Sequence, residues 1–508
     1  MIFPASHWLR VIVHLFAISL FTVSMASGLR LAVDGDWLLG ELWAFIAPQG
    51  NVIAWHLGAA VAWIILLLVV VGALRRKWVT LGSSSSRSSG VAISLLYVLL
   101  PAQLGSGLAL YFGVMFSDLM LPLHYWLSLL LLAIVVLHML EQLVVRRGRF
   151  LPSVFIPAYK ASGLGIVLTA GLVGAFFWWG SGAGQQDLYV FDLPDQVRIK
   201  VDGDASDEVW TQAPALTVVT SQGNQYQQSV PVRIKAMANQ YTAYFLISWP
   251  DDTPDYAHLP LVKSSEGWSA LHDGFERDDE RTFYEDKLAV MISQGNGFAG
   301  DNSIHLGKAP LSGYPVSRSG RGFHYTTDGT IRDVWHWKAL RGADMSVLDD
   351  DHFGPPEAPC AFCPRYKAGY QTDPAEAGGV RQNWEWFRSD GITPLRLPGD
   401  TLVKPVDQNA MAWYGSRAYS PELDTLPTGA RMPSVLWMSH YEGDRGDVRG
   451  RARWQDGVWT LELARARDTG SPYDIVIEDG VFMWVAPFNH AQTRHAYHHR
   501  PIRLRMQP

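Results

Sequence analysis

Residues 122–145 read PLHYWLSLLLLAIVVLHMLEQLVV, an apolar stretch that carries two histidines. The stretch is long enough to cross the hydrocarbon core of a bilayer as one helix. On such a helix His124 and His138 fall within about 40° of the same face and about 21 Å apart along the axis. One helix would therefore offer an imidazole toward each side of a membrane. Ionisable side chains inside a bilayer are costly and are usually functional.

Four other apolar stretches are long enough to span a bilayer, so the sequence predicts five transmembrane helices. The predicted spans are residues 11–33, 53–74, 91–116, 122–145 and 162–180. Basic residues favour the cytoplasmic side, and a cytoplasmic amino terminus puts nine of them there: Arg10, Arg75, Arg76, Lys77, Arg87, Arg146, Arg147, Arg149 and Lys160. We therefore expect a multi-pass protein of the bacterial inner membrane, with the chain beyond residue 180 in the periplasm.

Charge divides the chain at the same place as hydrophobicity. Residues 1–185 carry ten basic and five acidic side chains, whereas the remainder carries 32 basic and 43 acidic ones. The acidic part has no basic stripe, which argues against a nucleic-acid partner. We expect a four-helix domain at residues 1–150, a fifth helix and linker at 151–186, and a water-soluble domain at 187–508.

Two more histidines lie in predicted spans, and the predicted topology gives each a depth. His14 and His138 lie toward the cytoplasmic side, whereas His56 and His124 lie near the outer side. Depth therefore pairs His14 with His138 and His56 with His124. A haem iron held by two neutral imidazoles needs such pairs on facing helices, so we expect two membrane haems. A lone membrane histidine would be explained more simply as a hydrogen-bonding group between helices.

The first four predicted spans resemble the di-haem cytochrome b family, which includes the membrane subunits of formate dehydrogenase and nickel-iron hydrogenase. The matching positions are His14 followed by Ser27-Gly28 on the same helix, His56 with Gly58, and the His124/His138 pair. The resemblance implies two b-type haems and quinone exchange, which by analogy occurs near the His14/His138 haem. The fifth span departs from the four-helix pattern and would carry the remaining chain across the membrane.

Beyond residue 187, short alternating runs replace the long apolar stretches. Residues 232–238, 241–249, 287–293 and 458–464 alternate with the period of a β-strand. Gly, Pro, Asp and Asn separate these runs, so the sequence predicts an antiparallel β-sandwich. The expected fold class is α + β and multidomain: a four-helix di-haem bundle, a fifth spanning helix and this sandwich. We expect the surplus length in long loops at residues 251–281 and 341–430.

Three stretches of this part are similar to the haem-binding subunit of ethylbenzene dehydrogenase, which resembles those of dimethyl sulfide dehydrogenase and chlorate reductase. They are VDGDASDEVW at 201–210, YEDKLAVM at 284–291 and DVWHWK at 333–338. The resemblance implies a third b haem held by a methionine and a lysine, which map onto Met291 and Lys338. A thioether is a soft, neutral iron ligand, and a lysine can bind iron only when it is deprotonated.

Simpler roles exist for both residues. Strand periodicity places Met291 on the face opposite Val290, where it could pack like any core methionine. It places Lys338 on one face with His336, where the lysine could be an ion-paired side chain. His336 is the rival ligand to Lys338, because histidine is the commoner metal ligand, and Met237 is the rival to Met291.

The chain has two cysteines, Cys360 and Cys363. Pro364 follows them instead of a histidine, so they lack the pattern for attaching a c-type haem. Two cysteines are also too few for a four-cysteine iron–sulfur cluster. A local disulfide or a pair of thiols is the simpler interpretation.

These patterns predict a membrane-anchored electron-transfer protein. Two membrane b haems and one in the exported domain would link the quinone pool to a periplasmic redox protein or oxidoreductase subunits. No catalytic centre for substrate chemistry is evident, so any enzyme activity would be quinol:acceptor oxidoreduction, with the chain alone or as a cytochrome subunit of a complex. The alternative is a haem-bearing anchor with a receptor domain that resembles carbohydrate-binding modules; an anchor without haem is a third hypothesis.

Overall fold

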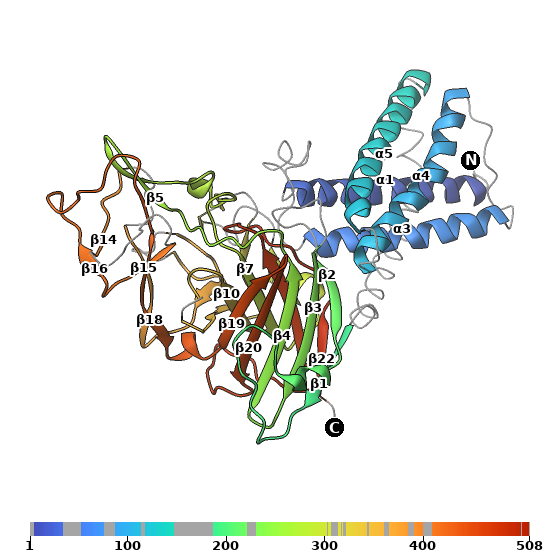
Figure 1. The fold of residues 1–508 in the computed structure, drawn as a ribbon. Coiled ribbons are helices and arrows are strands. Elements are labelled where there is room, and N and C mark those ends of the chain that lie inside the picture. The colour runs from blue at the N-terminus through green and yellow to red at the C-terminus, as the bar shows by residue number, and fades with distance from the viewer. Residues whose placement is uncertain are drawn as a thin grey trace. The chain divides into compact units, whose positions relative to one another are not determined.

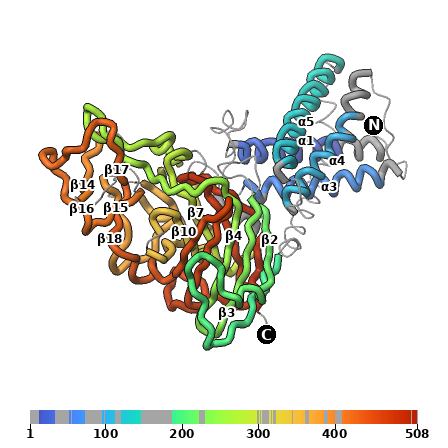
Figure 2. Tube along the Cα trace, in the orientation of Figure 1, coloured from blue at the N-terminus to red at the C-terminus, as the bar shows by residue number. Residues whose placement is uncertain are grey.

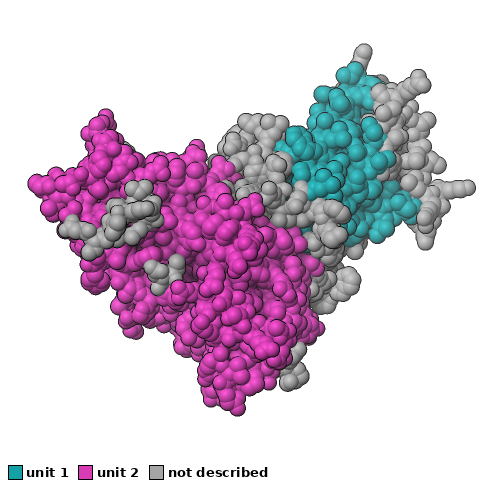
Figure 3. All heavy atoms as spheres, viewed as in Figure 1, with its two compact units in different colours: residues 1–184 teal, residues 185–508 magenta. Residues whose placement is uncertain are grey.

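The computed structural model has two compact units, residues 1–184 and 185–508 (Figure 3). The described residues are 5–33, 52–75, 87–112, 117–146, 186–220, 230–301, 303–305, 313–315, 317–318, 322–342, 345–359, 365–384, 391–399, 409–498 and 500–506. The fifth predicted span and both cysteines lie outside these residues.

Four long helices make up the described part of the first unit (Figure 1). They are α1 (Ala5–Val33), α3 (Val52–Arg75), α4 (Arg87–Phe112) and α5 (Ser117–Arg146). Three contain stretches long and apolar enough to cross a membrane, namely Ile12–Ala32, Trp55–Gly72 and Leu119–Val145, and α4 contains a shorter apolar segment, Val98–Tyr111. Each of the four helices falls on a predicted span.

The helices expose large apolar side chains that water would not tolerate in such number. Leu68, Leu137 and Val144 are 67%, 64% and 74% exposed. Apolar side chains on the outside of a helical bundle are typical of a surface that meets lipid. Within the unit, α1 packs along α3 and α4 along α5, so the four helices form two pairs.

The second unit is built on a large sheet of twelve strands. Its order is β12 (Tyr370–Thr372), β11 (Asp349–Phe353), β10 (Arg332–Lys338), β7 (Lys287–Ser293), β21 (Phe482–Phe488), β22 (Ile502–Met506), β1 (Gln186–Asp192), β3 (Val230–Ala238), β4 (Thr242–Pro250), β20 (Val458–Ala466) and β19 (Arg449–Gln455), with β2 (Leu216–Thr220) beside β3. The pairs are antiparallel except that β1 runs parallel to both β22 and β3. The prediction of a wholly antiparallel sheet is therefore wrong at β1, which enters between the two halves.

Aromatic contacts show that the two halves of this sheet face each other. Trp335 and Trp337 on β10 contact Phe245 and Trp249 on β4 edge to face, with ring centroids 5.7 Å apart in both pairs. Strands β10 and β4 are far apart in the strand order, so these contacts require the sheet to fold over on itself. One apolar core fills the space between the halves, which is the arrangement of a sandwich.

The segments expected as long loops carry structure of their own. Residues 251–281 contain β5 (Leu261–Ser264) and β6 (Gly267–Ala270), which pair with each other, and β5 also pairs with β17 (Arg431–Met432). The later segment contributes β13 (Ala377–Gln382), β14 (Arg396–Pro398), β15 (Ala410–Ala412) and β16 (Ser416–Ala418), with β18 (Val435–Glu442) pairing to two of them. Figure 2 shows β14 to β18 gathered at one side of the unit. A separate apolar core around Trp268 and Trp384 holds part of this region together. Its strands are too short to show a clear alternation in the sequence, so the prediction of long loops missed them.

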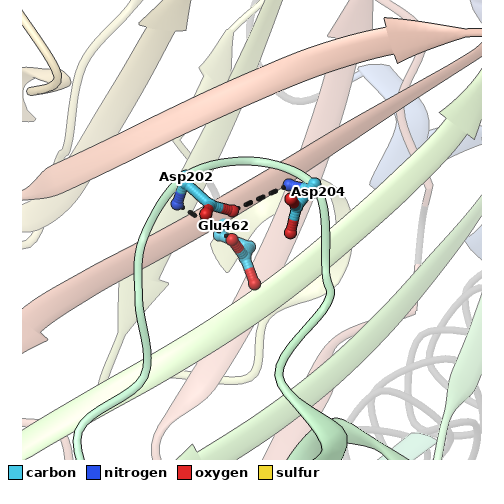
Figure 4. Close-up of side chains that lie close together, drawn as sticks. All are labelled: Asp202, Asp204 and Glu462. Atoms are coloured by element: carbon cyan, nitrogen blue, oxygen red, sulfur yellow. Dashed lines mark hydrogen bonds between the residues drawn. The ribbon is translucent and has the colours of Figure 1, made fainter.

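The segment at 201–210 is a loop pinned by one carboxylate, Glu462 on β20 (Figure 4). Glu462 accepts the backbone N–H groups of Asp202 and Gly203, at 3.0 and 2.9 Å, and the indole N–H of buried Trp210 at 2.8 Å. Gly203 has φ +81°, and a Cβ there would lie 2.9 Å from the backbone of Ala452. The acidic motif therefore has a structural role in closing this loop against β20.

Candidate functional site

The membrane-type unit brings the rings of His56 of α3 and His124 of α5 next to each other, with their planes nearly perpendicular. Their ring centroids are 6.1 Å apart and their planes are inclined by 80°. Two imidazoles that bind one metal from opposite sides, each through a bond of about 2 Å, have centroids about 6 Å apart. The spacing of these two rings therefore suits a shared metal ion, and their pairing as haem ligands stays a prediction.

Each of the two imidazoles has a serine hydroxyl on a neighbouring helix. Ser27 Oγ of α1 lies 2.9 Å from Nδ1 of His56, and Ser106 Oγ of α4 lies 2.9 Å from Nδ1 of His124. A hydrogen bond at one ring nitrogen fixes the ring and leaves the other nitrogen for a metal. Both rings are thus held by Nδ1, and Nε2 is the atom available as a ligand.

A glycine follows each of these serines and makes room for the ring. A Cβ on Gly28 would lie 3.2 Å from Cε1 of His56, and one on Gly107 would lie 3.0 Å from Cε1 of His124. By contrast, a Cβ on Gly72 or Gly105 would meet nothing within 4 Å. The pattern serine, glycine and facing histidine therefore occurs twice, once in each helix pair.

Gln103 of α4 lies at the ring nitrogen of His124 that a metal would use. Its Nε2 lies 3.1 Å from Nε2 of His124 and donates to Ser128 Oγ at 2.6 Å. Its Oε1 is buried and has no hydrogen-bond partner among the described residues. The Gln103 amide must move away from Nε2 of His124 before a metal can bind there.

The second predicted pair is less defined. His14 lies on an exposed position of α1, and His138 lies on α5, one helix with His124 as predicted. Nδ1 of His138 is buried and has no hydrogen-bond partner among the described residues. His14 and His138 as a ligand pair remain a prediction.

In the sheet unit, the two faces of β7 and β10 differ as the periodicity predicts. Val290 and Trp335 point into the main core and are fully buried, whereas Met291 and Lys338 lie on the other face. Met291 is paired with Val334, and Lys338 lies four residues further along β10. Met291 and Lys338 are therefore about 13 Å apart along the strand direction, on one face of the sheet.

Small side chains form the floor between these two residues. Ala289 of β7 and Ala486 of β21 are cross-strand partners, and Ala289 also pairs with His336 of β10. We call the space bounded by Met291, Lys338 and these alanines the slot. The two alanines of its floor are partly exposed, whereas the other residues of β7 and β21 are buried.

The Met291 end of the slot is apolar. Met291 packs with Val334, Phe353, Phe482 and Trp484. Its sulfur accepts a hydrogen bond from Ser303 Oγ at 3.5 Å. These contacts hold the thioether in place and keep most water from it.

The Lys338 end is charged. Lys338 Nζ donates to Asp349 Oδ2, and Arg445 Nε donates to Asp349 Oδ1 at 2.5 Å. Burial opposes ionisation of Asp349, but the Lys338 and Arg445 cations outweigh it and hold the pKa of Asp349 well below its usual range. Arg445 would remain as a partner for Asp349 if Lys338 left.

Sequence reasoning missed Lys287, the cross-strand partner of Lys338. Lys287 Nζ donates to Gln492 O at 2.8 Å and lies 4.0 Å from the ring centroid of Phe488. Burial and the nearby Arg341 cation lower the pKa of Lys287 well below the usual range of a lysine. The missed signal was the period-two spacing of Lys287 and Met291, which puts both on one face.

The two rival ligands have different surroundings. His336 lies on the slot face, and its Nδ1 is 3.2 Å from Tyr370 Oη, which itself donates to Asp351 at 2.7 Å. Nδ1 must therefore carry the proton, so Nε2 is a bare acceptor, and it is buried with no partner among the described residues. Met237 is fully buried in a different apolar cluster with Trp210 and does not face the slot.

Comparisons with known proteins concern the sheet unit. The model of the family described as Ethylbenzene dehydrogenase matches residues 207–500, which include β7 and β10. No curated protein matches the chain.

Three solved structures are similar over most of their own length. Two are a carbohydrate binding module of family 9 from Caldicellulosiruptor kristjanssonii, with glucose (8% identity, 64% of this chain and 97% of that chain, TM-score 0.25) and with cellotriose (9%, 64%, 95%, 0.23). The third is a putative carbohydrate-binding protein from Bacteroides uniformis (8%, 62%, 90%, 0.25). At these TM-scores they carry no argument about what the slot binds.

Proposed function

Because the chain belongs to the ethylbenzene dehydrogenase family by the match at residues 207–500, we propose that it is a membrane-anchored haem protein that carries electrons between quinone and a redox partner. The membrane-type helices would hold two b haems and the slot would hold a third. The partner is a periplasmic redox protein or the other subunits of an oxidoreductase. The orientation that follows is an amino terminus in the cytoplasm and a sheet unit in the periplasm of a bacterium.

The juxtaposition of His56 and His124 is the observation that carries this proposal. Their centroid spacing of 6.1 Å leaves room for one iron between two nitrogens. Ser27 and Ser106 orient the rings through Nδ1, and this second layer of contacts is typical of metal-binding histidines. Nε2 of His56 and, once the Gln103 amide moves aside, Nε2 of His124 would be the two ligand atoms.

Separation along the strand favours Lys338 over His336 as the partner of Met291 in the slot. The backbones that supply two ligands on opposite sides of a haem must stand well apart. Lys338 is offset from the partner of Met291 by four residues, about 13 Å, whereas His336 is offset by two residues, about 7 Å. His336 instead lies beside Ala289, between the two ends of the slot. The alanine floor leaves space for a flat group standing on edge between Met291 and Lys338.

The residues around the ligands have definite roles in this proposal. Bound haem would supply one-electron transfer. When Lys338 becomes neutral its proton would pass to solvent, and Asp349 would keep Arg445 as its ion-pair partner, because Arg445 already pairs with Asp349. The apolar cluster of Phe353, Phe482 and Trp484 excludes water from the methionine sulfur. The His14/His138 pair, on the cytoplasmic side, is where we expect quinone to exchange electrons.

Reduction by quinol tests the function directly. The full-length chain in lipid nanodiscs, kept without oxygen, would be mixed with a quinol while haem absorbance is followed. We expect quinol to reduce all haems of wild type, whereas in His124→Ala reduction of the slot haem should be strongly impaired, because the haem between it and the His14/His138 haem is missing. The matched control is His440→Ala, because His440 is an exposed histidine of β18. No response of wild type to quinol, with full reduction by dithionite, would refute the quinone-linked role.

A further inference from the structure

A group of carboxylates lies on the opposite face of the slot-bearing strands, between the two halves of the folded sheet. Asp333 of β10 and Asp350 of β11 are completely buried, and the side chain of Asp474, in the loop after β20, is 3% exposed. One oxygen from each of the three lies within 4.8 Å of the others. Oxygens that bind one Ca²⁺ at about 2.3–2.6 Å are separated by at most about 5 Å, so the three can share an ion.

The cluster holds more negative than positive charge. Its cation is Arg465 of β20, whose Nη1 lies 3.0 Å from Asp333 Oδ2 and whose Nη2 lies 2.8 Å from Asp474 Oδ2. A fourth acid, Asp447, adjoins Asp350 and Asp474. One guanidinium therefore faces four carboxyl groups.

Five carboxylate oxygens of the cluster have no N–H or hydroxyl donor among the described residues. Among the described residues, nothing donates a hydrogen bond to Oδ1 of Asp333, Asp447 and Asp474 or to either oxygen of Asp350. Leaving buried carboxylates without compensation is very costly. Either protons or a cation must balance these groups.

The acidities agree with an unbalanced site. Burial raises the pKa of Asp333 to about 8 and that of Asp447 to about 6. Burial and the neighbouring Asp333 carboxyl hold the pKa of Asp350 well above its usual range. A bound divalent cation would stabilise the ionised carboxylates and so lower these pKa values.

We propose that Asp333, Asp350 and Asp474, with Asp447, form a buried binding site for a hard divalent cation, Ca²⁺ in the first place. The donors are all oxygens, which is the ligand set that Ca²⁺ prefers, and five of them are unpartnered. The ion would join β10 and β11 to the loop after β20 and, through Asp447, to the segment just before β19. It would thereby brace the strands that carry the slot from behind.

The other acidic group of the unit differs and supplies a control. Asp202, Asp204 and Glu462 also lie close together (Figure 4). Both oxygens of Glu462 already accept hydrogen bonds from N–H donors. That group needs no ion, so Asp202→Asn should leave cation binding unchanged.

Thermal unfolding of the full-length chain in detergent, followed by tryptophan fluorescence, tests the site. After treatment with EGTA, CaCl₂ would be added to about 1 mM free Ca²⁺, within the range of weak natural sites. We expect the midpoint of the sheet unit's transition to rise by several degrees in wild type and in Asp202→Asn. In Asp350→Asn the rise should disappear. Binding of ⁴⁵Ca²⁺ should fall in parallel, from one ion per chain to none.

The outcomes separate a cation from protons. Asp350→Asn removes one of the crowded carboxylates, so in EGTA it should be at least as stable as wild type; Asp474→Asn provides the same test from a loop. A wild-type midpoint that does not respond to Ca²⁺, together with a fall between pH 6 and 8 that Asp350→Asn reduces, would show that protons balance the cluster. That result, or an equal Ca²⁺ response in Asp350→Asn, would overturn the proposal.

Discussion

At the scale of single residues, the membrane site depends on two hydroxyl groups that hold two rings. Ser27 and Ser106 each lie in the interior of a helix, and Ser27 also donates to its own helix backbone at Val23 O, 2.6 Å away. The sequence indicated His56 and His124, because histidines in apolar stretches stand out. It did not indicate the serines as their partners, because a serine in a helix most often bonds its own backbone. Only the packing of α1 on α3 and of α4 on α5 identifies that role.

Removal of one hydroxyl should weaken the haem site without unfolding the helices. In Ser27→Ala, His56 loses its Nδ1 partner, and such losses typically cost about 10–100-fold in metal affinity. The measurement is the rate of haem transfer from the purified chain to an excess of apomyoglobin. Thr22→Ala is the control, because Thr22 Oγ1 donates to Ile18 O on the same helix. Equal rates in the two variants would contradict the role of Ser27.

A second consequence at this scale concerns pH. Burial raises the pKa of Asp251 and of Asp286 to about 7 in the folded chain, whereas an unfolded aspartate titrates near 3.9. Between about pH 4 and 7 the folded state therefore binds more protons than the unfolded state, and the free energy of unfolding falls as pH rises.

Thermal melts should show this as a lower midpoint of the sheet unit at pH 8 than at pH 5.5. Asp251→Asn should flatten the dependence, because it removes one titrating group and its repulsion of Asp286. The measurements should be made with EGTA present, so that cation binding does not contribute. A midpoint that rises over this interval would show that the carboxyls are ionised in the fold.

At the scale of elements, the sequence predicted which face of a strand a side chain lies on, but not which strands pair. The alternation in β7 and β10 correctly put Met291 and Lys338 on the face away from the core. The floor of the slot could not be predicted, because Ala289 meets Ala486 only through the pairing of β7 with β21, which lie far apart in the sequence. The parallel pairing of β1 and the small sheets within 251–281 and 341–430 depend on long-range contacts in the same way.

Helix packing gives a sharper test at this scale. A Cβ on Gly107 would lie 3.0 Å from His124, closer than most real contacts, whereas one on Gly105 would meet nothing within 4 Å. Gly107→Ala should therefore displace the His124 ring and lower haem content and absorbance. Gly105→Ala, two residues away on α4, should behave as wild type. Identical spectra for both variants would show that His124 does not depend on this close approach.

At the scale of the whole molecule, the chain joins a unit that suits lipid to an acidic unit that suits water. The apolar composition of α5, on which Leu137 and Val144 are exposed, and the charge excess beyond residue 185 were both evident in the sequence. Family membership fixes the nature of the sheet unit. Because one chain contains both units, we propose that electrons pass along it between the membrane and a soluble partner.

The haem content of the full-length chain, measured by the pyridine haemochrome method against protein concentration, tests that claim most directly. We predict about three haems per chain, two held by the membrane histidines and one by the slot. His56→Ala should remove one, and Ala486→Leu, which fills the slot floor, should remove a different one, while Ala418→Leu on exposed β16 removes none. A colourless protein, or a haem ratio that neither His56→Ala nor Ala486→Leu changes, would contradict the account.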